Sequence, residues 1–175
     1  ETVPCESDFD MLSPALQDLW ITKSSRIKPD EYLSPEDKFK TYAGIFAEFG
    51  RIVCISMGLI HQNEGMPNIR MKSFFGDDEV QLLMDFSSLI NTHLDNKKYS
   101  YLCGHNIREF DIPYICRRML INQIPMPSKL YIAGKKPWEL EHFMDTLNLW
   151  KFGDYKNYTS LKLLMELFGL PSPKE

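Results

Sequence analysis

Three acidic side chains stand where the sequence pattern predicts strand ends: Glu1, Asp111 and Asp145. Ligand sites in α/β sheets lie beyond the carboxyl ends of strands, so acids at these ends can converge on one point. Carboxylates accompanied by few histidines suit hard divalent cations such as Mg²⁺ or Mn²⁺. Two such ions, about 3.5 to 4 Å apart, can clamp the attacking water and the leaving oxygen of a phosphodiester.

Structural roles compete with ligation for each of these acids. Asp111 follows Phe110 at a predicted strand-to-helix junction, where a helix N-cap and a metal ligand are equally good interpretations and both can hold. For Asp145 the residues alone favour a strand-end hydrogen bond to a loop. For Glu1 they favour a solvated terminal residue. The residue pattern by itself therefore leaves the ligand set open.

The elements that must position these acids follow from hydrophobic periodicity. Helix starts are predicted at Ser13 or Pro14, at residues 34–37, and at the capping residues Asp78 and Ser160. The last of these helices should turn Leu161, Leu164, Met165 and Phe168 inward and end at Gly169. A helix is also expected over residues 112–120, directly after Asp111.

Strands are predicted at residues 52–60, 69–75, 99–105 and 141–145, with a turn at residues 63–68. The run at 52–60 is nearly continuous apolar, which is typical of a strand covered on both faces. Strands and helices then alternate along the chain. This order predicts an α/β fold with a mixed sheet.

Composition limits the classes of function. The 175 residues fit one domain, and twenty basic against twenty-four acidic side chains give a net charge of -4. Nucleic acid held mainly by counterion release requires a more basic surface, so any nucleic-acid contact should be short and local. No apolar run is long enough to span a membrane. The four cysteines lack zinc spacing, which favours a reducing compartment and predicts a cytoplasmic protein.

Several motifs resemble those of one enzyme family. Glu1-Thr2 resembles the end of the Asp-x-Glu-Thr first motif of the DEDD, or DnaQ-like, 3′-5′ exonucleases. Asn106-x-x-x-Phe110-Asp111 resembles their second motif, in the form carried by the proofreading domains of family-B DNA polymerases. The segment 143–147 is similar to a strand that follows in many of these enzymes. Residues 135–138, 150–156 and 172–174 resemble the stand-alone bacterial group related to the family-B domain.

This resemblance implies an RNase H-like mixed β-sheet flanked by helices. It implies metal-dependent hydrolysis that removes nucleotides from the 3′ end of single-stranded DNA. Glu1 and Asp111 would be catalytic ligands of Mg²⁺ or Mn²⁺, with two ions in the complete site. Asp145 would support the site. The residues implied to contact the strand end are Thr2, Asn106 and Phe110.

Aromatic rings interleaved with lysines could stack bases and hold phosphates. They are Trp138, Trp150, Phe152 and Tyr155, with Lys135, Lys136, Lys151 and Lys156. The competing interpretation is a partly buried aromatic cluster under lysine side chains, which is favoured for Trp138 and Trp150. We expect His105 to pack at a strand end rather than to act as a base.

Two parts of the family pattern fall outside residues 1–175: the leading Asp of the first motif and the whole third motif. We therefore expect a single exonuclease-like domain, truncated at both ends, without its first strand and last helix. These 175 residues alone should show little or no nuclease activity. Two other functions stay open: a nuclease-like fold that only binds nucleic acid or acts as a scaffold, and an exonuclease acting on RNA 3′ ends.

Overall fold

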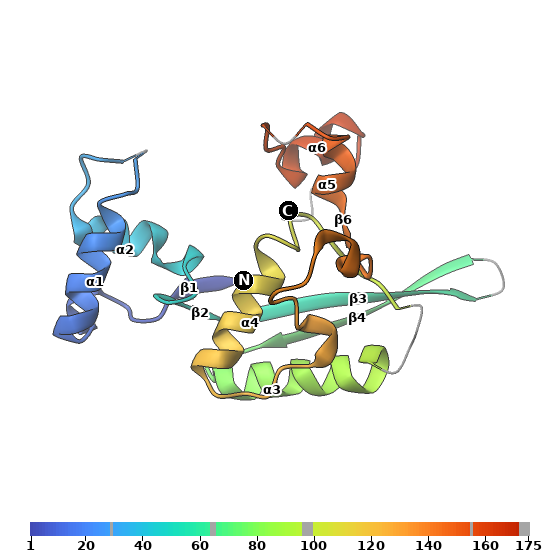
Figure 1. Ribbon diagram of the computed structural model, residues 1–175, viewed down its shortest axis with the longest axis horizontal. Coiled ribbons are helices and arrows are strands. Elements are labelled where there is room, and N and C mark those ends of the chain that lie inside the picture. Colours follow the sequence, from blue (N-terminus) through green and yellow to red (C-terminus); the bar gives the residue numbers. More distant parts are fainter. Residues whose placement is uncertain (29, 64–65, 96–99, 155, 172–175) are drawn as a thin grey trace.

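A computed structural model describes residues 1–28, 30–63, 66–95, 100–154 and 156–171, in which helices and strands build a mixed α/β structure (Figure 1). The strands are β1 (Thr2–Pro4), β2 (Gly50–Ile52), β3 (Cys54–Asn63), β4 (Met66–Phe75), β5 (Leu102–Gly104) and β6 (Phe143–Asp145). The α-helices are α1 (Pro14–Ser24), α2 (Pro35–Tyr42), α3 (Glu79–Ile90), α4 (Asp111–Ile121), α5 (Thr146–Lys151) and α6 (Leu161–Leu167). Shorter helical turns are η1 (Phe9–Met11), η2 (Ala43–Ile45), η3 (Asn91–Asp95), η4 (Ser128–Leu130) and η5 (Pro137–Leu140).

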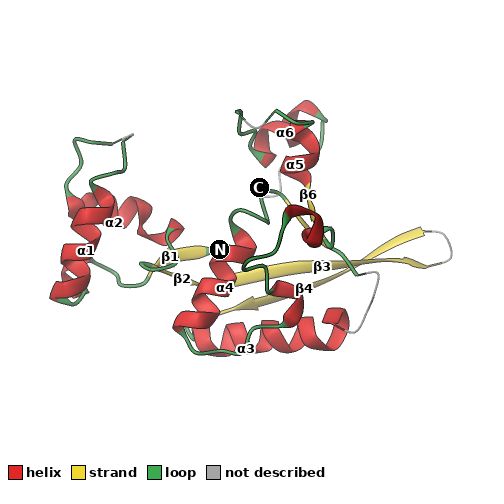
Figure 2. Ribbon diagram, viewed as in Figure 1, coloured by secondary structure: helices red, strands yellow, loops and turns green. Residues whose placement is uncertain are grey.

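The strands form three two-stranded ladders. β1 pairs with β2 and β3 with β4, both antiparallel, whereas β5 pairs with β6 in parallel. Figure 2 shows the long β3–β4 ribbon and the short strands on either side of it. Mixed pairing is therefore confirmed, but the expected continuous sheet is divided. The reason is that β1 follows β2 for three residues only, and no strand in the described part of the chain joins β3 to β5.

The β3–β4 hairpin is longer than predicted and is covered on one face. Ten residue pairs run from Cys54 opposite Phe75 to Asn63 opposite Met66; the tip of the predicted turn, residues 64–65, lies outside the described residues. Phe74 packs toward α3, but Ile60 on the opposite face is 68% exposed. The expectation that both faces are covered is wrong, because α3 packs against only one side (Figure 1).

All four predicted helix starts are confirmed, and each has a capping side chain at its N-cap. Each capping side chain accepts the backbone N–H three residues on, which pairs one of the N–H groups that a helix start leaves unbonded. The donors are Leu16 for Ser13, Asp37 for Ser34, Gln81 for Asp78 and Leu163 for Ser160. Gly169 follows α6 with a positive φ of 63°, a conformation that favours glycine and ends the helix as expected.

Two apolar clusters hold the elements together. The larger lies between the hairpin, α3 and α4 and includes Leu83, Ile90 and Met119, all fully buried. The smaller surrounds Trp20, whose indole N–H donates to the Pro35 carbonyl at 2.8 Å and so joins α1 to α2. These helices form one end of the molecule, at the left of Figure 1.

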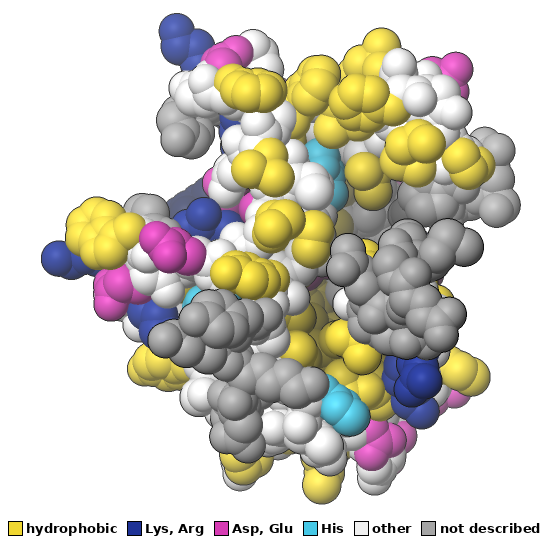
Figure 3. Space-filling model, turned by 90° about the vertical axis from the view of Figure 1, so that its right-hand side faces the viewer, with side chains coloured by type: hydrophobic (Ala, Val, Ile, Leu, Met, Phe, Trp, Pro, Cys, Tyr) yellow, Lys and Arg dark blue, Asp and Glu magenta, His cyan; other side chains and the backbone are white. Residues whose placement is uncertain are grey.

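The C-terminal helices expose much of their apolar surface. Leu164 is buried as predicted, but Leu161 is 38% exposed and Phe168 is 62% exposed, so the predicted inward positions of these two residues are wrong. The Phe168 ring lies edge-on to that of Trp150. Figure 3 shows hydrophobic side chains gathered at the upper part of the face that it presents, the level of α5 and α6 in Figure 1. None of the described helices combines the length and the apolar character needed to cross a membrane.

Candidate active site

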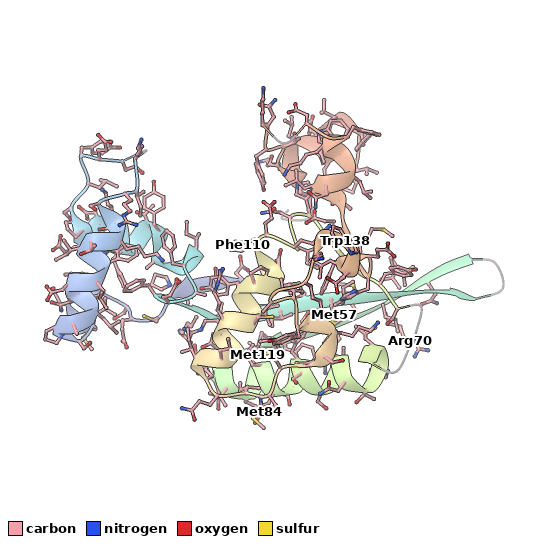
Figure 4. The ribbon with its side chains drawn as sticks, in the orientation of Figure 1. Met57, Arg70, Met84, Phe110, Met119 and Trp138 are labelled. Atoms are coloured by element: carbon pink, nitrogen blue, oxygen red, sulfur yellow. The ribbon has the colours of Figure 1, made fainter. Side chains whose placement is uncertain are left out.

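A cavity of about 380 Å³ lies between the N-terminal strand, the start of β3 and the start of α4. It brings together four of the residues that the sequence singled out: Glu1, Thr2, Phe110 and Asp111. Glu1 and Asp111 come from segments 110 residues apart and line the same space. Figure 4 shows Phe110 at the beginning of α4, close to the N-terminus marked in Figure 1.

Backbone pairing fixes Glu1 at the wall of this cavity. Its carbonyl accepts the N–H of Val53 at 3.0 Å, and its amino group donates to the Cys54 carbonyl at 2.5 Å. Thr2 continues the ladder opposite Ile52. The main chain of Glu1 is therefore held against the β2–β3 junction, while its carboxylate side chain is exposed.

Asp111 is the first residue of α4, and the N-cap position before it belongs to Phe110. Asp111 therefore does not occupy the N-cap position that the sequence allowed for it. Part of its side chain reaches solvent, but the cavity walls desolvate the carboxyl group and raise its pKa above the usual value. The nearby Asp145 raises the pKa further, whereas the amino group of Glu1 opposes the rise. A desolvated carboxylate of this kind gains from an added cation.

The turn before α4 explains two residue types in the motif. Asn106 has a positive φ of 64°, a conformation that asparagine tolerates better than most residues, and its carbonyl accepts the N–H of Phe110 at 2.9 Å. At Gly104 an added Cβ would lie 2.9 Å from the Cβ of Ile107, so only glycine lets the turn fold back here. Asn106 therefore shapes the turn and is not among the residues that line the cavity.

Asp145 holds this turn from behind. Its carboxylate is at the end of β6, is 4% exposed, and accepts the N–H groups of Asn106 at 2.9 Å, Arg108 at 3.1 Å and Leu147 at 3.0 Å. The hydrogen bond from a strand end to a loop, predicted from the residues alone, is thus present. Asp145 lies behind the cavity wall and fixes the approach to Asp111.

Tyr114 is a cavity residue that sequence reasoning missed. It lies one helical turn after Asp111, its ring is 5.6 Å from that of Phe110, and its hydroxyl donates to the Gly44 carbonyl at 2.8 Å. Burial raises the pKa of Tyr114 to about 12, and the neighbouring Thr2 side chain offsets part of this rise. The sequence feature that could have identified Tyr114 is its position three residues after Asp111 on a predicted helix, because side chains at this spacing are neighbours.

A buried ion pair fixes the other end of α4. Arg118 donates to Glu79 of α3 at 2.5 and 2.9 Å, and to the Ala47 carbonyl at 2.9 Å. Glu79 also accepts the N–H of Ile52 at 2.7 Å and the Asn122 amide at 3.1 Å. The helix that carries Asp111 is therefore attached to α3, β2 and the segment before β2.

The aromatic residues farther along the chain separate into two groups. Trp138 is 66% exposed with the Lys136 ammonium 5.1 Å from its ring centre, and Phe152 is 93% exposed, so burial of Trp138 is not observed. Trp150 is partly covered, because its indole N–H donates to Thr159 and its ring meets Phe168. Tyr155 lies outside the described residues.

His105 joins the motif turn to the C-terminal segment. Its Nδ1 lies 3.0 Å from the Thr146 hydroxyl and its Nε2 lies 2.8 Å from the Thr159 carbonyl. Both ring nitrogens are therefore engaged in structural hydrogen bonds, as expected of a residue that packs rather than reacts.

The donor set of the cavity fits a hard cation. In the part of the chain that the structure describes, no group of three or more His, Cys, Asp or Glu side chains lies together. The cavity still offers two carboxylates, Glu1 and Asp111, one of them desolvated. Mg²⁺ is commonly bound through one or two carboxylates completed by water and substrate phosphates, so this pair suits Mg²⁺ or Mn²⁺.

Comparison with protein families gives one match. Residues 51–148 match the model described as DNA polymerase family B, exonuclease domain. This range contains Asn106, Phe110, Asp111, Tyr114 and Asp145, whereas Glu1 and Thr2 precede it. Searches of curated proteins and of solved structures found no significant match. Small sheets flanked by helices, together with this match, are consistent with the RNase H-like exonuclease fold.

Proposed function

Because the chain belongs to the exonuclease domain family of family-B DNA polymerases, we propose that it removes nucleotides from the 3′ end of single-stranded DNA by metal-dependent hydrolysis. Family membership supports a nuclease. We further propose the direction of degradation, the DNA substrate, the role of metal and the roles of individual residues. Residues 1–175 would act as one exonuclease-like domain of a cytoplasmic protein.

The observation that carries this proposal is the shared cavity of Glu1 and Asp111. Both residues line a space that is also lined by Thr2 and Phe110, so a strand end entering it would meet two acidic residues and an aromatic residue together. Glu1 and Asp111 would hold Mg²⁺ or Mn²⁺. When bound, such ions lower the pKa of an attacking water and stabilise the departing 3′ oxygen.

The remaining residues orient the strand end. Phe110 is partly exposed at the cavity rim, where its ring can stack on the terminal base. Thr2 lines the cavity, where its backbone or hydroxyl would contact the terminal nucleotide. Asn106 shapes the turn that presents Phe110, and Asp145 supports that turn from the opposite side.

Exposed aromatic side chains would hold the nucleotides upstream of the end. Trp138 (Figure 4) and Phe152 are largely exposed. The Lys136 ammonium lies 5.1 Å from the centre of the Trp138 ring. Aromatic stacking with nearby lysines binds single strands without sequence preference. A short, local contact of this kind suits a protein with a net charge of -4.

Degradation of end-labelled oligonucleotides by the full-length protein tests the proposal. With Mn²⁺ present, a 5′-labelled DNA strand should shorten one nucleotide at a time, and a strand blocked at its 3′ end should stay intact. Asp111→Asn should lower the rate by more than the 10- to 100-fold typical of residues that merely support a metal ligand. Asp85→Asn, which removes an exposed acid of α3, is the matched control and should keep the wild-type rate.

The same assay separates the competing functions. Faster shortening of a matched RNA strand would identify an RNA exonuclease. Binding of the DNA strand without shortening, under every metal condition, would identify a non-catalytic binding module. Equal rates for wild type and Asp111→Asn would refute the assignment of the site.

A further inference from the structure

The hydroxyl group of Tyr114 joins three segments of the chain. It donates to the Gly44 carbonyl at 2.8 Å, and the Thr2 side chain lies close enough to offset part of the rise in its pKa. Gly50 lies against it so closely that a Cβ added there would be 2.2 Å from the Tyr114 oxygen. The tyrosine is 3% exposed, so this hydroxyl is shielded from water.

The turn that contains Gly44, whose carbonyl accepts the Tyr114 hydrogen bond, packs closely against β1. An added Cβ at Gly44 would lie 3.1 Å from the carbonyl carbon of Val3, so the turn and the strand are in backbone contact. Gly50 is paired with Pro4 at the other end of the same strand. Two glycines thus allow α4, the turn and β1 to approach closely.

These contacts connect the two acids of the cavity. Thr2 directly follows Glu1 in the chain, and Tyr114 follows Asp111 by one turn of α4. Arg118, one turn farther along, donates to the Ala47 carbonyl, just after the Gly44 turn. A shift of β1 against α4 would therefore disturb the Gly44 turn and the hydrogen bond that it accepts from Tyr114.

From this geometry we infer that Tyr114 is a positioning residue: its hydroxyl sets the separation of the Glu1 and Asp111 carboxylates, and so the fit of the cavity to its cation. This inference rests on the proposed function of the cavity. The phenol touches neither nucleotide nor cation. It acts by bonding the helix of Asp111 to the Gly44 turn, which packs against the strand that follows Glu1.

Tyr114→Phe tests the inference, because it removes the hydroxyl and keeps the buried ring. In the full-length protein we expect the Mn²⁺ concentration for half-maximal exonuclease rate to rise, and kcat to fall, by about 10- to 100-fold, as for other residues that support metal ligands. KM for the oligonucleotide should stay within about twofold, because Phe110 and the exposed aromatic residues still hold the strand. Tyr131→Phe, which alters an exposed tyrosine away from the cavity, is the matched control.

A metal-binding measurement separates positioning from general destabilisation. Mn²⁺ binding without nucleic acid, followed by electron paramagnetic resonance, should show the same loss of affinity.

The outcomes distinguish failure of the inference from failure of the proposed function. An active wild type whose Mn²⁺ dependence is unchanged by Tyr114→Phe overturns the positioning role alone. So does a variant whose rate falls only in proportion to its unfolded fraction. A wild type that neither binds Mn²⁺ nor degrades DNA overturns the proposed function, and the positioning role with it.

Discussion

The Asp145 carboxylate accepts the backbone N–H of Asn106 at 2.9 Å, across 39 residues of sequence. Gly104 ends β5 opposite Asp145 at the end of β6, and Asn106 lies two residues beyond Gly104, so this bond closes the edge at which the motif turn begins. The turn carries Phe110 and leads into Asp111. One buried acid thus determines where another acid enters the cavity.

Asp145→Asn should destabilise the fold strongly. The amide has one acceptor oxygen and no charge, so it cannot satisfy the three N–H groups that the carboxylate now accepts. We expect the free energy of unfolding to fall by about 2–4 kcal/mol, measured by urea denaturation. Asp154→Asn changes an exposed acid that bonds only to its neighbours and should cost less than about 0.5 kcal/mol. Equal stability of the two variants would refute the role of Asp145.

Arg118→Met should leave Glu79 as an unpaired buried charge. We expect a loss of about 3–5 kcal/mol in the free energy of unfolding, and a smaller loss when Glu79→Met is added, because the double variant has no orphaned charge. Arg117→Met, at the neighbouring exposed position, is the control. A double variant that is less stable than Arg118→Met would show that the pair itself, rather than the unpaired charge, dominates.

Mild acid should weaken the fold through His142. Partial burial lowers the pKa of His142 below its ordinary value, and the charges of Lys129 and Lys135 lower it further, although its bond to the Lys129 carbonyl opposes this. The unfolded chain takes up the proton near pH 6.5, before the folded chain does. The contribution of His142 is therefore complete above about pH 6.5 and is lost as the pH falls through the lower pKa of the folded state.

The measurement for His142 is the difference in Tm between pH 7.5 and pH 5.5. His142→Gln keeps a donor for the Lys129 carbonyl but does not titrate, so its Tm should fall less than that of the wild type. His93→Gln, at an exposed position, should behave like the wild type. A wild-type fall that His142→Gln leaves unchanged would assign the acid sensitivity to other groups.

Trp138→Ala should weaken the binding of a single strand without changing the chemistry at the cavity. Loss of one stacking platform should cost about 1–3 kcal/mol in binding free energy, measured by fluorescence anisotropy of a labelled oligonucleotide in EDTA. Tyr32→Ala removes another exposed ring, 82% accessible, from the loop between α1 and α2 and should have no effect. Equal losses of binding free energy for the two variants would mean that the oligonucleotide does not bind along Trp138.

Local chemistry made much of this fold predictable. Ser34 and Ser160 cap their helices because each hydroxyl accepts the backbone N–H three residues later. This interaction is local and does not depend on distant segments. The same holds for Gly169, whose positive φ ends α6. The structural role of Asp145 could also be predicted, because an acid at a strand end needs hydrogen-bond donors from an adjoining loop.

Features that depend on contacts between distant segments could not be predicted from local sequence patterns. The apolar run that includes Ile60 does not reveal whether a second layer covers it, and in the described structure α3 covers one face only. Tyr114 bonds to Gly44, 70 residues earlier, so its importance depends on a contact that no periodicity encodes. For the same reason the expected single sheet could not be distinguished from three short ladders.

The most direct test of the central claim is anomalous scattering from crystals of the full-length protein soaked in Mn²⁺. We predict a peak in the cavity, within about 2.0–2.6 Å of carboxylate oxygens from both Glu1 and Asp111, and its loss in Asp111→Asn. No peak between these two carboxylates, or carboxylates too far apart to share a site, would contradict the account.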